Sequence, residues 1–536
     1  MNRWFLYLPL LLMPLWPAVA AVLFGLVGAG LVLKRQGVGG GWLFLTLMLL
    51  GGVGQVLAPQ SLYKLPQQPA YIESATGPVA ENLLEVYALD KLFGWNHQDG
   101  AGGWAQQVGE GFWRLPRWNP ASGLEQSEFL TDNWYPITPG QTYTQSFYLR
   151  HDGKEARFQI TFFTNTGHHP VPTQMEAVAP RVWRLWASYT AQEGDHSLRA
   201  IDFINAGGDW RYLEVGWAKL EVGSSPSAFS WGQTGERSLS WRLEWWLGMM
   251  LLGFLVLQGG GVLKQLVPSW MAGALLLGMG IHLGYALWQL GSPPYEGFRP
   301  PGLTPQPNLL GHTAVMLAGL VWLLGGSRWG GAALAVSGLL IWVTGSRAAF
   351  WGWLLLLGVW WWGLGRWRWG MLGALVGGAL LLAWQPEWLG RLSQATTLDS
   401  SAQSRLVIWQ VAIQAFLEHP WTGVGFGNFP VYYQIHRPQG ALEAITGHAH
   451  NLWLHLLAEG GGLALLGFLL WLSGLLGWLI RLRAGRALAL VAVVLVLGLF
   501  DFSFFFAGVY YTLLLALGFY ISRFDSSLQD RHKIPR

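Results

Sequence analysis

Hydrophobic residues are collected into long apolar runs over most of the chain, and most of these runs contain no Lys, Arg, Asp or Glu. Each run is close to the length that a helix needs to cross a bilayer, although several are short. The pattern therefore predicts about 12 membrane-crossing helices. They fall at residues 4–16, 18–33, 42–58, 241–257, 271–290, 309–325, 330–345, 348–363, 369–384, 452–480, 487–499 and 509–521.

A long polar region at residues 59–240 interrupts the apolar runs and follows a different pattern. Residues 141–163 alternate between apolar and polar positions on both sides of Asp152–Gly153, which predicts two strands joined by a turn. Residues 209–223 predict further short strands, and no helical period competes with them. The fold class is therefore mainly α, a polytopic membrane protein, with an inserted β-sandwich of jelly-roll type.

Basic residues decide the orientation that we expect for the helices. With the N-terminus in the cytoplasm, nearly every short basic loop falls on the cytoplasmic side, as the positive-inside rule requires. The residues concerned are Arg3, Lys34, Arg35, Lys264, Arg328, Arg366, Arg368, Arg481, Arg483, Arg486 and the basic tail. The insert, the link at residues 291–308 and the loop from residue 385 to 448 are then expected outside.

These patterns divide the chain into six regions. Residues 1–58 hold N-terminal transmembrane helices, 59–240 the extracytoplasmic insert, 241–384 central transmembrane helices, 385–448 an outer loop, 449–522 C-terminal transmembrane helices and 523–536 a cytoplasmic tail. Residues 1–20 have an alternative interpretation as a signal peptide, because a basic start and an apolar stretch precede Ala18 and Ala20. Cleavage there would leave the expected orientation unchanged.

Composition supports a membrane protein. Of the 536 residues, 52% are hydrophobic and only 12% are charged, which is too little charge to cover a soluble protein of this size. The chain has no cysteine, which excludes a disulfide framework and a thiolate metal site. The formal net charge of +4 is small, and we expect a lipid bilayer and not nucleic acid as partner.

The insert carries two weaker signals. Residues 220–229, LEVGSSPSAF, resemble the last strand of carbohydrate-binding sandwich modules. Exposed aromatic side chains could stack on sugars, but they could equally fill the core of the insert. His168 and His169 are adjacent and have no third partner nearby in the sequence, which favours a surface loop over a metal site.

Two arginines lie at the expected outer boundary of the membrane. Arg347 stands between two apolar runs, where the positive-inside rule disfavours it, and it either snorkels to the interface or binds an anionic headgroup such as a phosphate. Arg405 opens an expected amphipathic helix on the outer membrane surface, followed by a glycine-rich turn at residues 423–429. That turn either brings backbone amides to a phosphate or is a tight return of the chain. The expected apolar face of the helix is Leu406, Trp409, Ile413 and Phe416.

Three histidines occur in the stretch TGHAHNLWLHLLAEGG, at residues 446–461. His448 and His450 lie at or before the start of a predicted helix, on which Asn451, His455 and Glu459 form one stripe. The histidines could be interfacial side chains with satisfied hydrogen bonds, metal ligands, or a general base. A metal is disfavoured because no carboxylate cluster is near them in the sequence.

Four stretches in order resemble the O-antigen ligase and polymerase superfamily of membrane glycosyltransferases, from about residue 241 to 521. PQPNLLGHTAVML is similar to its Pro-Asn segment, and TGSRAAFWGWLLLL to its Ser-Arg signature. RLVIWQVAIQAFLEHPWTGVGFGNF resembles its Arg, Trp, His-Pro and glycine run, and AHNLWLHLLAEGG its His-Asn signature. Each match is weak alone, and the order of all four makes the resemblance specific.

The resemblance implies transfer of a glycan from an undecaprenyl-diphosphate carrier to an acceptor hydroxyl on the outer face of the bacterial inner membrane, without a metal or other cofactor. His450 matches the family's His and is the expected base. Arg347 and Arg405 match its two outer arginines and are expected to hold the diphosphate. Asn308, His448, Asn451 and Glu459 are candidate supporting residues, and the role of His455 stays open.

The resemblance leaves the substrates undecided. The acceptor is a sugar of lipopolysaccharide for a ligase, another repeat unit for a polymerase, or a pilin side chain for a protein glycosyltransferase. A transporter of lipid-linked glycans is disfavoured because we find no internal repeat and the key charges lie at the outer boundary. The insert departs from the family, whose early helices are usually joined by short loops, and it could bind acceptor, glycan or cell envelope.

Overall fold

The computed structural model describes residues 7–33, 42–72, 79–96, 102–116, 127–130, 133–152, 157–199, 203–207, 212–232, 234–292, 299–364, 400–443 and 445–531. The chain forms two compact units. The helical unit comprises residues 1–59, 237–429 and 447–536, and the strand-rich unit comprises residues 60–236 and 430–446. Residues 430–446, which the sequence places in the outer loop, thus belong to the same unit as the insert.

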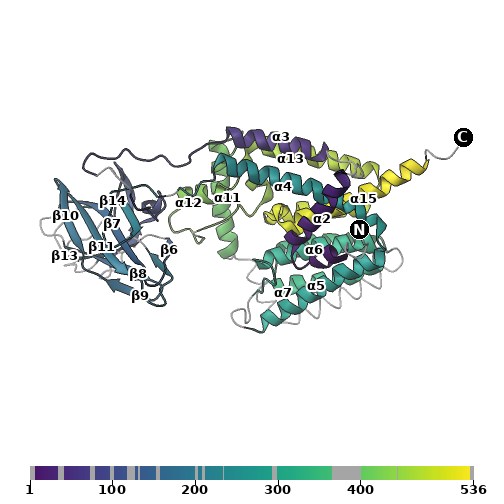
Figure 1. Cartoon of the computed structure of the whole chain (residues 1–536), viewed down its shortest axis with the longest axis horizontal. Helices are drawn as coiled ribbons and strands as arrows, with labels where there is room; N and C mark the ends of the chain where they lie inside the picture. The colour runs from purple at the N-terminus through teal and green to yellow at the C-terminus, as the bar shows by residue number, and fades with distance from the viewer. Residues whose placement is uncertain are drawn as a thin grey trace. The chain divides into compact units, whose positions relative to one another are not determined.

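Eleven of the twelve predicted apolar segments overlap helices of the helical unit, and the remaining one, residues 369–384, lies outside the described residues. Figure 1 shows the helices running alongside one another within this unit. They are α1 (Tyr7–Leu12), α2 (Pro17–Leu33), α3 (Trp42–Leu57), α4 (Leu239–Gly260), α5 (Pro268–Leu290), α6 (Pro307–Gly325), α7 (Ser327–Thr344), α8 (Arg347–Trp362), α11 (Ser400–Glu418), α13 (Leu452–Arg481), α14 (Gly485–Phe500) and α15 (Ala507–Arg531).

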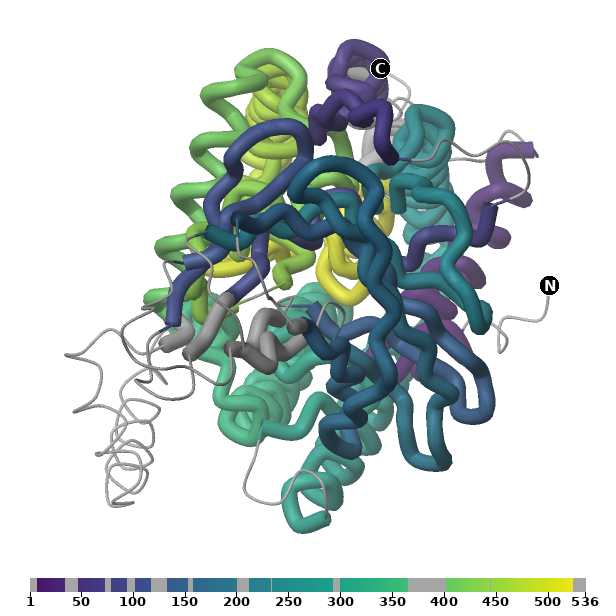
Figure 2. The backbone as a smooth tube through the Cα atoms, turned by 90° about the vertical axis from the view of Figure 1, so that its left-hand side faces the viewer, coloured from purple at the N-terminus to yellow at the C-terminus, as the bar shows by residue number. Residues whose placement is uncertain are grey.

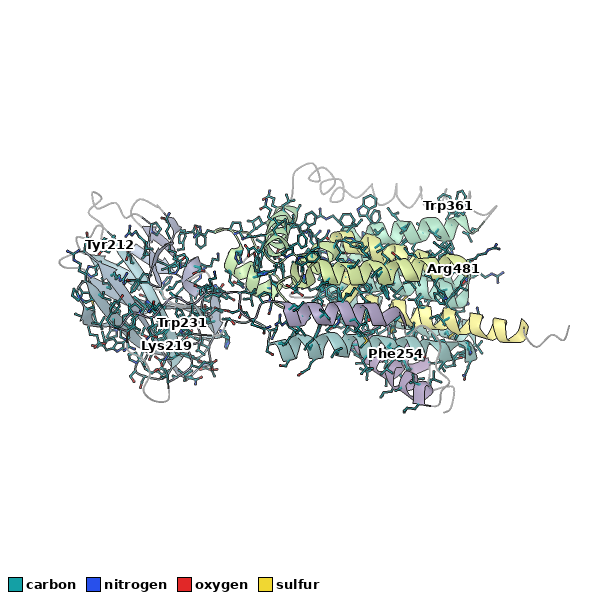
Figure 3. All side chains as sticks on the ribbon, turned by 90° about the horizontal axis from the view of Figure 1, so that it is seen from above. Tyr212, Lys219, Trp231, Phe254, Trp361 and Arg481 are labelled. Carbon is teal, nitrogen blue, oxygen red and sulfur yellow. The ribbon has the colours of Figure 1, made fainter. Side chains whose placement is uncertain are left out.

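Four helices are long and apolar enough to cross a membrane among the residues described: 239–265, 268–290, 307–325 and 452–481. Shorter apolar helices cover residues 17–33, 47–57 and 485–500. The chain is thus a membrane protein, and the full set of 12 crossings stays a prediction. Trp361 near the end of α8 and Arg481 at the end of α13 lie at the same end of the helical unit (Figure 3).

Helix α6 is the central element of the helical unit. Every residue from Leu310 to Leu324 is buried, and the helix packs on α5, α7, α8, α14 and α15. Pro307 opens the helix, where its missing N–H costs no hydrogen bond. A Cβ at Gly311 would meet Ser346 and Ala349 within 3.0 Å, so this glycine permits close contact with the start of α8. The first turn of α6 is therefore fixed deep in the protein.

Helix α13 is broken, whereas the sequence pattern predicted one continuous segment at residues 452–480. Gly461 has φ 60° and ψ −162°, which interrupts the helical backbone. A Cβ at this position would lie 2.4 Å from backbone atoms of Trp421 and Thr422. Gly462 N–H donates to Pro420 O at 2.8 Å and Leu463 N–H to Trp421 O at 3.1 Å. The break thus lets the turn after α11 approach the helix and use its exposed backbone groups.

The insert is strand-rich, as predicted, and its antiparallel strands form two sheets (blue shades in Figure 2). One sheet contains β2 (Gly102–Trp104), β1 (Phe93–Asn96), β5 (Ser127–Leu130), β13 (Phe203–Gly207), β8 (Arg157–Thr164), β12 (Ser197–Arg199) and β6 (Trp134–Pro136), with β9 (Gly167–Pro170) on β8. The other contains β10 (Gln174–Ala179), β11 (Val182–Thr190), β7 (Thr142–His151), β14 (Leu213–Val222), β4 (Phe112–Arg114) and β3 (Gln106–Gly109).

The strands predicted around Asp152–Gly153 are present but do not pair with each other. Strand β7 lies between β11 and β14, and β8 pairs with β9, β12 and β13 in the other sheet. The two predicted strands are therefore consecutive along the chain but belong to different sheets. Turn residues such as Asp152–Gly153 occur both between paired strands and in connections between two sheets. The sequence does not say which strands will pair with each other through hydrogen bonds. Phe147 of β7 and Phe162 of β8 are both fully buried in the core between the sheets.

The motif LEVGSSPSAF at residues 220–229 has a structural explanation. Lys219 and Glu221 of β14 are both 1% exposed and form an ion pair of 3.1 Å. The Lys219 ammonium donates to Ser227 Oγ at 2.6 Å and to Ala228 O at 2.8 Å, while Ser227 N–H donates to Glu221 at 2.9 Å. The pair fixes the chain that follows the last strand, and a buried pair with this many hydrogen bonds is costly to break.

Asp195 is the centre of a buried hydrogen-bond network in the insert, and its loss should destabilise this unit. Its carboxylate accepts from Thr164, Thr166, Tyr189 and the Gln192 N–H at 2.5–2.8 Å. Burial by itself raises the pKa of Asp195, but these hydrogen bonds lower it well below its ordinary 3.8. Asp195→Asn should lower the free energy of unfolding by about 2–4 kcal/mol, because an amide nitrogen would face hydrogen-bond donors.

The stability that Asp195 provides should depend on pH. Because its pKa is lower in the folded than in the unfolded state, its contribution is complete above about pH 4 and is lost as the pH falls. Thermal unfolding should therefore separate wild type from Asp195→Asn more strongly at pH 7 than at pH 3. The exposed neighbour Glu193, changed to Gln, serves as the matched control. Equal melting temperatures of wild type and Asp195→Asn at pH 7 would contradict this assignment.

Candidate active site

Glu459 joins the broken helix α13 to the glycine-rich turn. Its carboxylate accepts hydrogen bonds from the backbone N–H of Gly427 and of Phe429, both at 3.0 Å. The same carboxylate lies 3.2 Å from His455 Nε2, and Glu459 is only 4% exposed. Glu459 is therefore a residue that holds the turn and orients His455.

The glycine-rich turn is a tight return of the chain, because the protein itself uses its amides. Val424 N–H donates to Ala458 O at 2.8 Å and Gly425 N–H to Glu459 O at 2.9 Å, and Phe426 N–H donates to Gln55 Oε1 at 2.6 Å. Three glycines in the turn have positive φ, namely Gly423, Gly425 and Gly427. With these amides occupied, the interpretation of the turn as a phosphate cradle loses its basis.

His448 and His450 meet a carboxylate that comes from far along the chain. Asp501 ends α14, and its Oδ1 lies 3.4 Å from His450 Nδ1 and 4.0 Å from His448 Nδ1. The Phe502 N–H donates to the same oxygen at 2.8 Å, which fixes the orientation of the carboxylate. The two imidazole rings meet edge to face, with centroids 4.3 Å apart. The three side chains form one compact cluster.

The backbone at His450 is left-handed, with φ 48°. This conformation is uncommon outside glycine and costs of the order of 1 kcal/mol. It directs Nδ1 toward Asp501, and an N–H at Nδ1 would leave Nε2 as the lone-pair nitrogen of the neutral ring. The geometry is that of a carboxylate orienting an imidazole base.

Burial sets the charge state of the cluster. Burial, together with the nearby His450, His455 and Arg405, lowers the pKa of His448 to about 3 against the opposing effect of Asp501. Burial alone would raise the pKa of Asp501, but its interactions with His450, His312 and His448 bring it well below its ordinary value. Near neutral pH the cluster therefore contains an ionised Asp501 and a neutral His448.

Aromatic side chains from the turn after α14 wall in the histidines. The ring of Phe502 lies 5.5 Å from that of His448 and 3.8 Å from that of His455, and Phe506 lies 5.9 Å from His448. This turn, residues 501–506, thus supplies both the carboxylate and the apolar wall. A low-dielectric wall strengthens the electrostatic interactions inside the cluster.

Asn451 and His455 have structural contacts. Asn451 caps α13, since its Oδ1 accepts from Leu454 N–H at 3.0 Å, and its Nδ2 donates to Leu499 O at 2.9 Å. His455 Nδ1 accepts weakly from Ala449 N–H at 3.4 Å, and its other ring nitrogen faces Glu459. Both residues therefore fix the chain on either side of His450.

The arginines fall in different positions around the cluster. Arg405 in α11 is half-buried and close enough to His448 to lower its pKa. Arg347 is the first residue of α8 and its side chain is exposed. Arg299, which the sequence analysis did not single out, donates to Asn308 Oδ1 at 2.6 Å and to Thr344 O at 2.5 Å. Asn308 is therefore placed to hold Arg299.

His312 connects the first turn of α6 to the turn that carries Asp501. Its Nδ1 lies 2.7 Å from Ser503 Oγ, and both residues are fully buried. The signature segment of α6 is thus in direct contact with the turn that carries Asp501, about 190 residues further along the chain.

Helix α11 is present, as predicted, and of its expected apolar face Trp409 and Phe416 are half-buried while Leu406 and Ile413 are exposed. Leu406 and Ile413 are each 45% exposed. The face packed on the helical unit is made instead of Ile408, Val411 and Ala415. The helix therefore has apolar side chains on two sides, as expected for a helix between protein and lipid.

Asp501 is the functional candidate that the sequence analysis missed. It is separated from His450 by the whole of α13 and α14, so no spacing rule connects them. The available signal was its position as an isolated acidic residue in the apolar stretch LGLFDFSFFF. An ionisable group beside a membrane segment is by itself a candidate for function.

His448, His450 and Asp501 could in principle bind a cation. One ligand atom from each lies within 4.8 Å of the other two. The sequence has no carboxylate cluster near these histidines, but the fold brings the carboxylate of Asp501 next to them. Two imidazoles and a carboxylate suit zinc or iron, whereas a general base needs the same imidazole unliganded.

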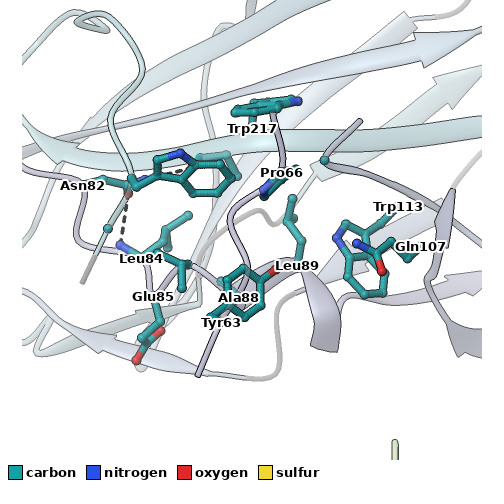
Figure 4. A pocket seen from close by; sticks show the side chains of 15 residues that line it. Tyr63, Pro66, Asn82, Leu84, Glu85, Ala88, Leu89, Gln107, Trp113 and Trp217 are labelled. Carbon is teal, nitrogen blue, oxygen red and sulfur yellow. Dashed lines mark hydrogen bonds between the residues drawn. The ribbon is translucent and has the colours of Figure 1, made fainter. Parts of the chain in front are cut away.

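The insert contains a small cavity. Its volume is about 30 Å³, roughly the space of one water molecule. Figure 4 shows Tyr63, Leu89 and Trp113 around it. A larger hollow of about 400 Å³ is lined by Tyr71, Arg150, Ala179, Pro180, Arg181, Val182 and Tyr212.

Comparisons with known proteins find a family match within the helical unit. A solved structure titled "CBM4 structure and function" matches 27% of this chain and 95% of its own at 14% identity, with a TM-score of 0.16, which is too low for any argument. No curated protein matches the chain. Residues 313–469, which include Arg347, Arg405, His450 and Glu459, match the family model described as O-antigen ligase. The resemblance to the O-antigen ligase and polymerase superfamily is thus confirmed, and residues 313–469 are the part of the chain that carries it.

Proposed function

We propose that this protein transfers a glycan from an undecaprenyl-diphosphate carrier to an acceptor hydroxyl, without a metal. The observation that carries the proposal is the contact of 3.4 Å between His450 Nδ1 and the buried carboxylate of Asp501, beside Arg405. This arrangement provides a base for the hydroxyl and a cation for the departing diphosphate. The family match supports the class of reaction.

In the proposed reaction, His450 Nε2 takes the proton of the acceptor hydroxyl as its oxygen bonds to the anomeric carbon of the glycan. The bond between that carbon and the diphosphate oxygen breaks, and the electron pair leaves with the lipid diphosphate. Asp501 stabilises the imidazolium that forms, and the proton later passes to water. Guanidinium groups stabilise the charge that develops on the diphosphate.

Arg405 and Arg347 are the proposed diphosphate ligands. Arg405→Ala should lower the transfer rate by about 10²-fold, while Arg405→Lys should restore part of it, because an ammonium keeps the charge but loses the bidentate geometry. Arg347→Ala is expected to have a similar effect. Transfer from purified lipid-linked donor, normalised to the amount of membrane protein, measures these rates. Normal transfer in either alanine variant would remove that arginine from the proposed site.

The site is proposed to face the periplasm of a bacterial inner membrane. The C-terminal ends of α8 and α13 lie at the same end of the helical unit. This supports the orientation expected from the basic loops, which places both ends on the cytoplasmic side. A reporter that functions only in the cytoplasm should be active when it is fused after residue 481. Reporter activity outside would reverse the assignment and leave the histidines on the wrong side for this function.

The identity of donor and acceptor can be read from the products. Mass analysis of surface glycans in a deletion strain should show full-length glycan that is not attached to acceptor, if the protein is a ligase as we propose. Single repeats attached to acceptor would indicate a polymerase, and loss of glycan from pilin a protein glycosyltransferase. Lipid-linked glycan retained on the cytoplasmic side would favour a transporter.

We also propose that the insert binds carbohydrate. The hollow of about 400 Å³ supports it, because its tyrosines Tyr71 and Tyr212 offer faces for sugar rings and its arginines offer hydrogen-bond donors. Other exposed aromatic residues, such as Trp134 at 44%, lie on the insert as well. The ligand would be the transferred glycan or the acceptor.

A further inference from the structure

The segment at residues 430–446 connects the glycine-rich turn to the histidines, yet it folds with the insert. The chain leaves the helical unit after Phe429 and returns to it at Gly447. Helix α12 (Phe429–His436) begins this segment. At one end, Phe429 N–H donates to Glu459, and at the other end His448 follows closely. Both ends of the segment thus lead directly to residues of the candidate site.

Buried polar contacts hold the segment in the strand-rich unit. Lys91 Nζ donates to Arg437 O at 3.0 Å, and these residues are only 5% and 2% exposed. Gln439 Nε2 donates to Ala105 O at 3.2 Å. A lysine ammonium is rarely buried to this degree unless its hydrogen bonds are satisfied. These contacts are therefore specific and cannot be exchanged for water without cost.

Apolar packing and internal hydrogen bonds complete the attachment. Val431 is 6% exposed and packs in one cluster with Val86 and Tyr87. Tyr433 is fully buried, and its hydroxyl donates to Glu443 O at 2.8 Å, which closes the segment on itself. A segment with this burial and bonding has one defined shape. The shape exists only while the insert is folded.

The end of the segment limits the position of the base. His450 is four residues beyond Thr446, and four residues of extended chain span at most about 14 Å. Thr446 itself is 3% exposed. A displacement of the segment is therefore transmitted to His450 within a few residues, and small displacements of a catalytic group cost large factors in rate.

We propose that the insert is a positioning element of the transfer site, with Lys91 as its principal positioning residue. By fixing the shape of residues 430–446, Lys91 constrains the chain that leads into His448 and His450. This inference rests on the proposed function for its kinetic readout. It assigns the insert a role that does not depend on binding any sugar, because the attachment lies in the segment that continues into the site.

The test compares Lys91→Met with Lys64→Met, an exposed lysine of the same unit, in the full-length protein. For Lys91→Met, we expect faster hydrogen exchange in residues 430–446 and a fall in kcat of about 10- to 100-fold, with KM for the lipid-linked donor within about twofold. Lys64→Met should change neither. Hydrogen exchange in β14 shows whether the insert of the Lys91→Met variant is still folded. If the insert is unfolded, the same measurements are made on Gln439→Ala instead.

Two results would overturn the inference: faster exchange in the segment with unchanged kcat, or unchanged exchange. The exchange measurement does not depend on catalysis. If wild-type protein transferred no glycan, the proposed function would fail while exchange would still show whether Lys91 holds the segment. The two failures are therefore distinguishable.

Discussion

His450→Ala is expected to abolish measurable glycan transfer, with a loss of about 10³- to 10⁴-fold, while the protein still inserts and folds. A positioned base contributes a factor of this size because the acceptor hydroxyl has a high pKa and must lose its proton as the new bond forms. His450 also has a left-handed backbone and lies 3.4 Å from Asp501, and alanine would lose both the base and that contact. The measurement is the initial rate of transfer in reconstituted membranes.

His448→Ala provides the matched control for this prediction. His448 is adjacent in space, with ring centroids 4.3 Å apart, but burial keeps it neutral, with a pKa of about 3. We expect a smaller loss, of about tenfold, from poorer packing around His450. Equal losses in the two variants would show that the pair acts as one unit, and a normal rate in His450→Ala would exclude it as the base.

Asp501→Asn should lower kcat by about 10²- to 10³-fold and leave KM for the lipid-linked donor little changed. Asparagine keeps the shape of the side chain and removes the charge that stabilises the imidazolium. It also allows the neutral ring of His450 to adopt the other tautomer, in which Nε2 carries the proton and cannot act as the base. Asp501→Glu should retain more activity than Asp501→Asn, because the charge remains. A purely structural role would instead make the larger glutamate at least as harmful as asparagine.

Chelation separates the base mechanism from metal catalysis at the same residues. His448, His450 and Asp501 are close enough to share a cation, so the variants alone do not distinguish the two mechanisms. With His450 as base, transfer should be unaffected by EDTA. Loss of activity with EDTA and recovery with zinc would instead assign the three side chains as metal ligands.

Local sequence patterns predicted most of the helices because their cause is local. Apolar runs such as residues 309–325 become helices in a bilayer regardless of what they pack against, since each backbone group must be satisfied within its own segment. Alternation in the insert predicted strands such as β7 for a similarly local reason. The signature motifs indicated candidate site residues, among them Arg405 in α11 and His450 just before α13.

The partners of these elements were not predictable by the same means. The sequence indicated two consecutive strands around Asp152, but not that β7 and β8 belong to different sheets. It indicated one helix at residues 452–480, but contacts with Trp421 and Thr422 require the break at Gly461. Both outcomes depend on hydrogen bonds between segments that are distant in the chain.

The sequence by itself determined that this is a membrane protein with a strand-rich insert and a histidine-containing signature of the O-antigen ligase type, because apolar runs, alternation and motifs are properties of neighbouring residues. Only the tertiary structure placed Asp501 beside His450, used Glu459 to hold the glycine-rich turn, and put residues 430–446 into the insert. These are long-range contacts, and the burial and charge that define them exist only once the segments have packed together.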